Sequence, residues 1–163
     1  MKNKIVNGVL LSYAISLIIA CNPGKKESTV TVVDKEKIKM EIQAKEDEFA
    51  ATYNSGVAKS IGYYADDAIS FSQHRPPLVG KKAIVDYLLA DIDSSSRSNK
   101  ISFKTSEVFV SSDGNLVIEI GYYNVVDATN TTVNTGDYMC LFEKRNGKYV
   151  CLRDMSVSDK PVK

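Results

Sequence analysis

The stretch that decides the fold is GDYMCLFEKRNGKYVCLRDMSVSD, from Gly136 to Asp159. Two runs rich in β-forming residues, Tyr138 to Lys144 and Lys148 to Met155, flank the pair Asn146-Gly147. An Asn-Gly pair between two such runs is the strongest short-range signal for a type I′ turn. The stretch is therefore predicted to be the last hairpin of a curved antiparallel sheet, against which the rest of the chain packs.

The turn also predicts how the two strands pair. With Asn146 and Gly147 as the loop, Arg145 faces Lys148 and the pairing continues through Phe142 with Cys151, Leu141 with Leu152, Cys140 with Arg153 and Met139 with Asp154. Because side chains alternate along a strand, one face collects Tyr138, Cys140, Phe142, Tyr149, Cys151, Arg153 and Met155, and the other Met139, Leu141, Glu143, Val150, Leu152 and Asp154. Both faces are largely apolar, so each packs on something or lines a hollow. Arg153 and Asp154 point to opposite faces, and which of them faces the inside stays open.

The composition is that of an ordinary globular protein of single-domain size. The chain has 163 residues, of which 44% are apolar and 25% are charged, and its formal net charge is +1. Nucleic acids and anionic surfaces are bound by a clustered positive excess, which a nearly neutral chain does not supply. The charge therefore argues against nucleic acid as a partner.

The amino terminus is the one strongly biased segment. Lys2 and Lys4 precede an apolar run from Ile5 to Ala20 that ends at Cys21. A positive start followed by an apolar run is typical of a secretory signal peptide. The run is short and is interrupted by polar residues, whereas a membrane-spanning helix needs ~20 apolar residues. A signal peptide is therefore favoured over a transmembrane helix.

The end of that run, Ile18-Ile19-Ala20-Cys21, is similar to a bacterial lipobox, in which the cysteine is lipidated and becomes the new amino terminus. We expect residues 1–20 to be a lipoprotein signal peptide, residues 21–33 a tether that begins with the lipidated Cys21, residues 34–159 the folded domain and residues 160–163 a tail. Asn22 is not an aspartate, which by resemblance to lipoprotein sorting rules favours the outer membrane, facing the periplasm.

The first half of the folded domain is predicted to be helical. Apolar residues recur at helical spacing from Asp34 to Tyr53, with Asp34 as the N-cap and Gly56 near the end. A second short helix is predicted over Val57 to Tyr64. Ala65-Asp66-Asp67 is predicted to be a turn, and Ala68 to Ser72 a short strand. Pro76 and Pro77 enforce a loop, and a third helix is predicted over Lys81 to Asp91.

The second half is predicted to be strands. Ile101 to Val110 and Leu116 to Val126 are rich in β-forming residues and flank a turn at Asp113-Gly114. Asp127 to Thr135 is a polar connection to the final hairpin. Helices followed by antiparallel strands indicate an α+β fold with the helices on one side of the sheet.

Four passages together resemble the nuclear-transport-factor-2-like superfamily, in particular its SnoaL-like and ketosteroid-isomerase-like bacterial members. The passages are Phe49 to Gly56, Tyr63 to Ile84, Glu119 to Tyr122, and NGKYVCLRDMSVSD from Asn146 to Asp159. Their order and spacing carry the resemblance, which covers about Asp34 to Asp159. Tyr149 stands where the family commonly has tryptophan. The resemblance implies a cystatin-like cone, with three N-terminal helices packed on a strongly curved antiparallel sheet that leaves an open apolar pocket.

Isomerases of this family use a pocket carboxylate as general base, and the resemblance therefore directs attention to Glu119 and Asp154. Either could act as a base if buried, or could form an ion pair on the surface. His74, the chain's single histidine, could shuttle protons at a pocket mouth or could simply face solvent. These three residues are the catalytic candidates, and no fixed general-base motif can be placed on the sequence.

Aromatic residues supply the candidate ligand-binding set. Tyrosine offers apolar area with one polar tip, which suits either core packing or a ring-bearing ligand. The candidates are Tyr53, Tyr64, Phe71, Tyr87, Tyr123, Tyr138, Phe142 and Arg153. One histidine and no acidic cluster argue against a metal site, and no cofactor is indicated. Cys140 and Cys151 are expected on one face as diagonal neighbours, near the outer limit for a disulfide.

Three functions remain. The first is a membrane-anchored lipoprotein that binds a small apolar or amphipathic molecule without transforming it. The second is a ketosteroid-isomerase-like isomerase, cyclase or dehydratase that uses a pocket carboxylate as general base. The third is an interaction module that forms a homodimer through its sheet. The sequence favours the first and leaves open whether the protein is an enzyme.

Overall fold

The computed structural model describes residues 33–56, 61–94 and 99–161. They belong to one compact unit, residues 31–163. The predicted signal peptide and Cys21 lie outside the described residues, as does all of the predicted tether except Val33. Within the described part of the chain, neither helix combines the length and apolar character needed to cross a membrane.

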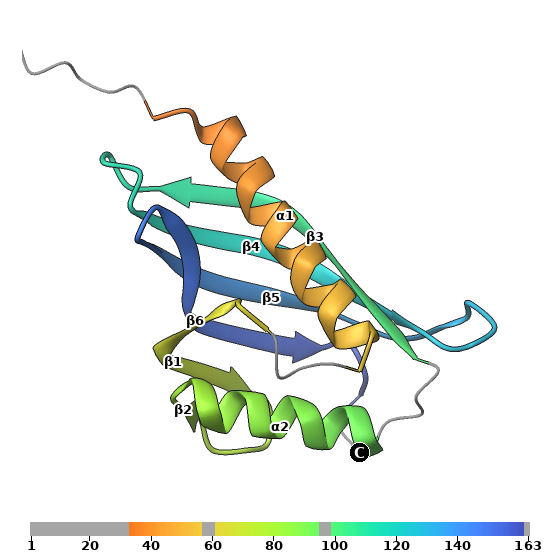
Figure 1. Cartoon of the computed structure of the whole chain (residues 1–163). Helices are drawn as coiled ribbons and strands as arrows, with labels where there is room; N and C mark the ends of the chain where they lie inside the picture. The colour runs from red at the N-terminus through yellow and green to blue at the C-terminus, as the bar shows by residue number, and fades with distance from the viewer. Residues whose placement is uncertain (1–32, 57–60, 95–98, 162–163) are drawn as a thin grey trace, which may run out of the picture. The chain divides into compact units, whose positions relative to one another are not determined.

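The described residues form a mixed sheet with two helices (Figure 1). The helices are α1 (Lys35–Asn54) and α2 (Lys81–Ser94), and the strands are β1 (Tyr64–Ser72), β2 (Leu78–Val79), β3 (Lys100–Val110), β4 (Leu116–Val126), β5 (Thr132–Arg145) and β6 (Lys148–Ser158). The six strands lie in the order β2-β1-β6-β5-β4-β3. The predicted α+β class is confirmed. The sheet is not purely antiparallel, however, because β1 pairs with β6 in parallel.

Helix α1 begins and ends as its sequence predicts. The Asp34 side chain accepts a hydrogen bond from the Lys37 backbone N–H at 3.0 Å, and Gly56 follows the helix with φ of 77°. Its buried residues are Ile38, Ile42, Glu46, Phe49 and Ala50. A carboxylate therefore lies within the apolar stripe that faces the sheet.

Side chains of α1 also bind the backbone of the edge strand β3. Gln43 donates to the Phe103 carbonyl at 3.2 Å and accepts from the Thr105 N–H at 2.8 Å. Asn54 exchanges two hydrogen bonds with Ile101, at 2.8 and 2.9 Å. An exposed strand edge invites pairing with other chains, and the helix occupies this one.

The predicted second helix is wrong where it can be checked. Residues 57–60 lie outside the described residues, Ile61 to Tyr63 have no regular structure, and Tyr64 begins β1. The predicted turn at Ala65-Asp66-Asp67 is also wrong, because these residues belong to β1. The physical reason is burial: Tyr63, Tyr64 and Ala65 are all at most 6% exposed, which anchors this segment in the sheet core.

The last hairpin has the predicted turn and a register that changes along its length. Asn146 and Gly147 have φ of 53° and 79°, as a type I′ turn requires, and Phe142 pairs with Cys151 as expected. Leu152 is then an extra residue on β6, so the next pairs are Leu141 with Arg153, Cys140 with Asp154 and Met139 with Met155. This β-bulge corrects the predicted faces: Asp154 joins the inner face and Arg153 the outer face.

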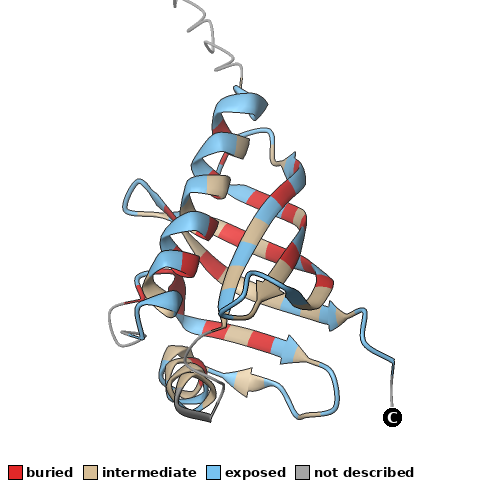
Figure 2. Ribbon diagram, turned by 90° about the vertical axis from the view of Figure 1, so that its right-hand side faces the viewer, coloured by how far each residue is buried: buried red, intermediate tan, exposed pale blue. Residues whose placement is uncertain are grey.

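The core fills the space between α1 and one half of the sheet (Figure 2). Its fully buried apolar members include Ile42, Val117, Phe142 and Cys151. The Phe142 ring meets the Tyr63 ring edge to face, with 5.5 Å between centroids.

The strand β5 begins at Thr132, so the polar connection predicted over Asp127 to Thr135 is shorter than expected.

Candidate functional site

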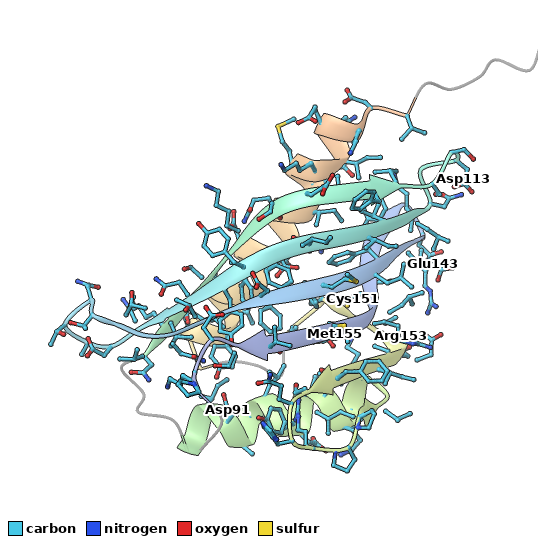
Figure 3. All side chains as sticks on the ribbon, turned by 180° about the vertical axis from the view of Figure 1, so that it is seen from behind. Asp91, Asp113, Glu143, Cys151, Arg153 and Met155 are labelled. Carbon is cyan, nitrogen blue, oxygen red and sulfur yellow. The ribbon has the colours of Figure 1, made fainter. Side chains whose placement is uncertain are left out.

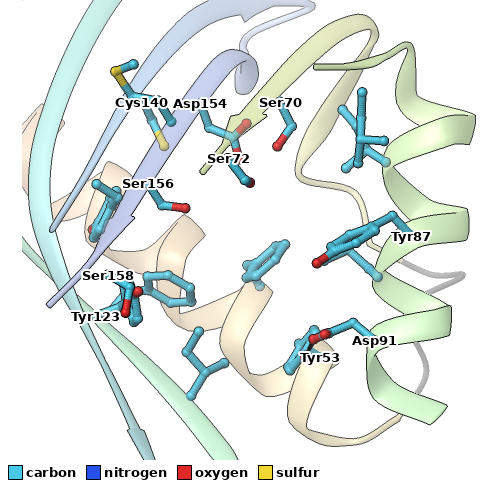
Figure 4. Close-up of a pocket in the computed structure, with 18 of the residues that line it drawn as sticks. Tyr53, Ser70, Ser72, Tyr87, Asp91, Tyr123, Cys140, Asp154, Ser156 and Ser158 are labelled. Carbon is cyan, nitrogen blue, oxygen red and sulfur yellow. Dashed lines mark hydrogen bonds between the residues drawn. The ribbon is translucent and has the colours of Figure 1, made fainter. Parts of the chain in front are cut away.

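A cavity of about 510 Å³ opens between the two helices and the inner face of the sheet (Figure 4). Its lining comes from α1, β1, the loop before β2, β2 itself, α2 and the strands β3 to β6. The size falls in the range of ~300–1,000 Å³ that is usual for small-molecule sites. The inside of the sheet is therefore not filled by its own aromatic side chains.

One wall of the cavity is aromatic. Phe103 from β3 lies edge-on to Phe49 of α1 and to Tyr138 of β5, with centroid separations of 5.6 and 5.4 Å. The Phe49 ring also stacks near Tyr53, at 6.2 Å. All four residues line the cavity. These mutual contacts hold the rings in place, so the wall exists before any ligand arrives.

A second part of the lining, next to the aromatic residues, carries hydroxyl and carboxyl groups. The parallel pairing of β1 with β6 sets Ser70 beside Asp154 and Ser72 beside Ser156, and all four line the cavity together with Ser158 (Figure 4). Because alternate residues of a strand share a face, the bulge at Leu152 is what brings the series Asp154, Ser156, Ser158 inward.

Asp154 is the cavity carboxyl best placed to take part in proton transfer. Its Oδ2 accepts a hydrogen bond from the Tyr64 hydroxyl at 2.9 Å, while its buried Oδ1 accepts none of ordinary geometry within the described part of the chain. Burial raises the pKa of Asp154, although the nearby hydroxyls of Ser70 and Tyr64 and the charge of Arg75 oppose this. Asp154 therefore has one oxygen available and an increased affinity for a proton.

A second acidic cluster lies deeper. Glu46 is 1% exposed and accepts a hydrogen bond from Tyr63, and Glu119 is fully buried. Glu119 Oε1 accepts from Thr105 at 2.6 Å and from Tyr138 at 2.8 Å, whereas its Oε2 accepts no hydrogen bond of ordinary geometry from the described residues. Burial and the neighbouring charge of Glu119 raise the pKa of Glu46 well above its ordinary value. Burial likewise raises the pKa of Glu119 despite the two hydroxyl donors.

Gly121 makes room for this arrangement. It pairs with Tyr138 across β4 and β5, and a side chain at Gly121 would occupy the position of the Tyr138 hydroxyl. Glycine therefore lets the Tyr138 ring cross the neighbouring strand toward Glu119.

The deep cluster offers three atoms of metal-ligand type, contrary to the expected lack of an acidic cluster. Oxygens of Glu46 and Glu119 and the sulfur of Cys140 lie within 4.8 Å of one another. The surrounding donors are hydroxyls of Tyr63, Thr105 and Tyr138, which suit carboxyl groups that share a proton. The donor set therefore fits a carboxyl pair better than a metal ion.

Cys140 and Cys151 are both buried and both free thiols. Cys140 lies 3.3 Å from the Tyr63 hydroxyl. The contact with Cys151, together with burial, raises the pKa of the Cys140 thiol. Burial also raises the pKa of Cys151. Both sulfurs are therefore protonated and unreactive at neutral pH.

The mouth of the cavity is formed by the loop that follows β1 and by α2. His74, with φ of 61°, and Gln73 line it beside Arg75. The Arg75 guanidinium lies over the Tyr87 ring, with 3.7 Å from Cζ to the ring centroid, and donates to Ser72 Oγ at 2.7 Å. One turn further along the same face of α2, Asp91 accepts a hydrogen bond from Tyr53 (Figure 4).

The structure places most of the predicted site residues at the cavity. Those that line it are Tyr53, Tyr64, Tyr87, Tyr123, Tyr138, His74 and Asp154. Glu119 lies behind Tyr138 and does not line it.

Three predictions of cavity contact are corrected. Phe142 is fully buried in the core, where it packs on Tyr63. Phe71 alternates with Ser70 and Ser72 on β1 and is 38% exposed. Arg153 lies outside and donates to the Asp67 carbonyl at 3.1 Å (Figure 3). None of the three lines the cavity.

Sequence reasoning missed several cavity residues. Glu46 could have been found, because it interrupts the apolar stripe of α1 one turn after Ile42. Ser156 and Ser158, two residues apart on β6, form a polar stripe that could also have predicted a polar part of the cavity lining. No sequence pattern marks Arg75 or Asp91 as a cavity residue, because only the fold brings them to the cavity.

No family model and no curated protein matches the sequence. Solved structures do match. A domain of unknown function with a cystatin-like fold from Nostoc punctiforme has a TM-score of 0.66 at 14% identity, over 81% of this chain and 82% of that one. An NTF2-like protein with a cystatin-like fold from Novosphingobium aromaticivorans has a TM-score of 0.61 at 12% identity, over 78% and 85%. The chain has the cystatin-like fold of nuclear-transport-factor-2-like proteins.

A ketosteroid isomerase-like protein from Erwinia carotovora atroseptica shares this NTF2-like fold. It matches with a TM-score of 0.61 at 17% identity, over 79% of this chain and all of that one. Identities this low show the fold alone. The function of a chain with this fold must therefore be argued from its own cavity.

Proposed function

We propose that this NTF2-like domain binds a small amphipathic molecule in its cavity. The observation that carries the proposal is an unfilled space of about 510 Å³ whose lining combines a group of aromatic rings with a group of hydroxyls. A mostly apolar cavity with a few converging polar groups is the usual form of a small-molecule site. Apolar area buried by the ligand supplies affinity at ~25 cal/mol per Å², and the polar wall fixes orientation.

The test uses two matched substitutions on β6. Ser156 lines the cavity, and no hydrogen bond of its side chain occurs among the described residues. Val157 is the next residue, faces outward and is 46% exposed. Ser156→Trp should fill the cavity and abolish the thermal stabilisation that hydrophobic metabolites give to the wild type, whereas Val157→Trp should preserve it. Equal stabilisation of both variants would contradict the proposal.

We propose further that the domain is held at a bacterial membrane by acyl chains on Cys21, at the outer membrane facing the periplasm. The supporting pattern is the apolar run closed by Ile18-Ile19-Ala20-Cys21. In that position the cavity would meet molecules that partition between the membrane and the periplasm.

A homodimer is supported by the outer face of the sheet. Met139 of β5 lies on this face, and Phe109 and Ile118 pair across β3 and β4. All three are at least 41% exposed. Such an apolar surface is typical of an interface. Met139→Lys should shift a dimer to monomer in sedimentation velocity without unfolding it, and a wild-type monomer at high concentration would refute the dimer.

Isomerase-like chemistry is the second candidate, and Asp154 favours it. In its ionised form, a carboxylate with a raised pKa and one free oxygen is a stronger base and can accept a proton from carbon next to a carbonyl. Glu46, which holds its proton more firmly, also lines the cavity and could donate to the carbonyl oxygen. The test is protein-dependent deuterium exchange of 1-tetralone in D₂O. Exchange that Asp154→Asn abolishes would support an enzyme, and exchange no faster than in buffer would exclude this activity on that ketone.

A further inference from the structure

Arg75 is a cation that forms no ion pair among the described residues, although its charge acts on the nearby Asp154. Its Nε and Nη1 are shielded from water and have no hydrogen-bond partner, while Nη2 donates to Ser72 Oγ at 2.7 Å. The ion pairs found among the described residues involve Lys45, Lys82 and Arg145, and none includes Arg75. Burying a charge without a partner costs free energy, so an unpaired guanidinium at a cavity indicates a missing anion.

The position of Arg75 is fixed by its neighbours. Its guanidinium lies 3.7 Å from the centroid of the Tyr87 ring, and the Ser72 hydroxyl holds one end of it. Pro76 and Pro77 follow directly and restrict the loop backbone. The guanidinium is therefore preorganised at the mouth, and binding of an anion costs little further conformational entropy of the Arg75 side chain.

Among the described residues that line the cavity, Arg75 is the one arginine or lysine. Arginine stays protonated at any physiological pH. The cavity carboxyls Glu46 and Asp154, by contrast, have pKa values raised by burial, which reduces their negative charge. A third carboxyl, Asp91, accepts a hydrogen bond from Tyr53. His74 and Gln73 add polar groups beside Arg75 at the mouth.

We propose that the cavity's ligand is an amphipathic acid, whose carboxylate pairs with Arg75 at the mouth while its apolar body lies against the aromatic wall. This assignment rests on the proposed binding function and names the class of ligand. It makes Arg75 the residue that determines specificity between an acid and a neutral molecule of the same shape.

Three isosteric probes test the assignment by isothermal titration calorimetry: 2-naphthoate, 2-naphthamide and 2-naphthylmethylammonium. The full-length wild type should bind 2-naphthoate at least tenfold more tightly than 2-naphthamide, and should bind the ammonium most weakly. Arg75→Gln should remove the preference for the acid and leave the affinity for 2-naphthamide within about twofold. Arg75→Lys, which keeps the charge, should retain part of the preference.

The control is Arg153→Gln, which removes one positive charge from the outer face of the same sheet. It should leave the preference for 2-naphthoate unchanged. Equal affinity for the acid and the amide, tightest binding of the ammonium, or a preference that survives in Arg75→Gln would overturn the acid assignment while leaving a binding cavity. Failure of all three probes, together with failure of every hydrophobic metabolite to stabilise the protein, would overturn both proposals.

Discussion

Glu46→Gln should flatten the pH dependence of stability. Glu46 is 1% exposed, and burial raises its pKa well above the ordinary value. The folded state therefore keeps a proton that the unfolded chain releases as the pH rises above the usual glutamate range. The free energy of unfolding falls with rising pH over that interval, at about 1.4 kcal/mol per pH unit for each proton involved. The stabilisation is complete at acid pH and is lost as the pH approaches the folded pKa.

The assay is urea denaturation of the full-length protein at half-unit steps from about pH 5 to pH 8. The wild type should lose stability with rising pH, and Glu46→Gln should reduce the slope by up to about 1.4 kcal/mol per unit because glutamine does not titrate. Glu48→Gln is the matched control, since this glutamate of the same helix is 62% exposed and forms a surface ion pair with Lys45. A wild type whose stability rises with pH over this interval, or a Glu46→Gln slope equal to that of Glu48→Gln, would refute a protonated buried carboxyl.

Three further predictions concern the network, the core and the anchor. Tyr138→Phe removes a 2.8 Å hydrogen bond to buried Glu119 and should cost ~1–3 kcal/mol in urea denaturation, whereas exposed Tyr122→Phe should change stability by less than ~0.5. Phe142→Ala empties a fully buried site and should cost ~3–5 kcal/mol; a loss below 1 would show that the core is not packed there. Cys21→Ser should abolish incorporation of labelled palmitate and leave an uncleaved precursor, and a wild type that takes up no label would refute the anchor.

Local chemistry accounts for the parts of the fold that the sequence predicts correctly. Asn146-Gly147 adopts positive φ at both positions because these residue types tolerate it, and this fixes the hairpin without help from the rest of the chain. Asp34 caps α1 through a hydrogen bond to a residue three positions away. Such signals lie within a few residues of the structure that they specify.

The candidate site depends on long-range pairing that no local signal carries. The bulge at Leu152 lies where β1 pairs with β6. The register of β1 shifts at the same place, since Tyr64 pairs with Cys151 and Ile69 with Arg153. The bulge turns Asp154 inward, whereas strict alternation from the turn places it outside. Glu46 is similar: its partners Tyr63 and Glu119 come from distant segments, so its burial follows only from the assembled sheet.

The central claim is that the cavity holds a small molecule, and native mass spectrometry of the full-length protein purified from its host tests it most directly. The wild type and Val157→Trp should carry a non-covalent molecule that organic extraction releases, and Ser156→Trp should carry none. The same bound mass in Ser156→Trp would place the molecule elsewhere. A wild type that is empty, and that no hydrophobic compound stabilises, would contradict a binding function.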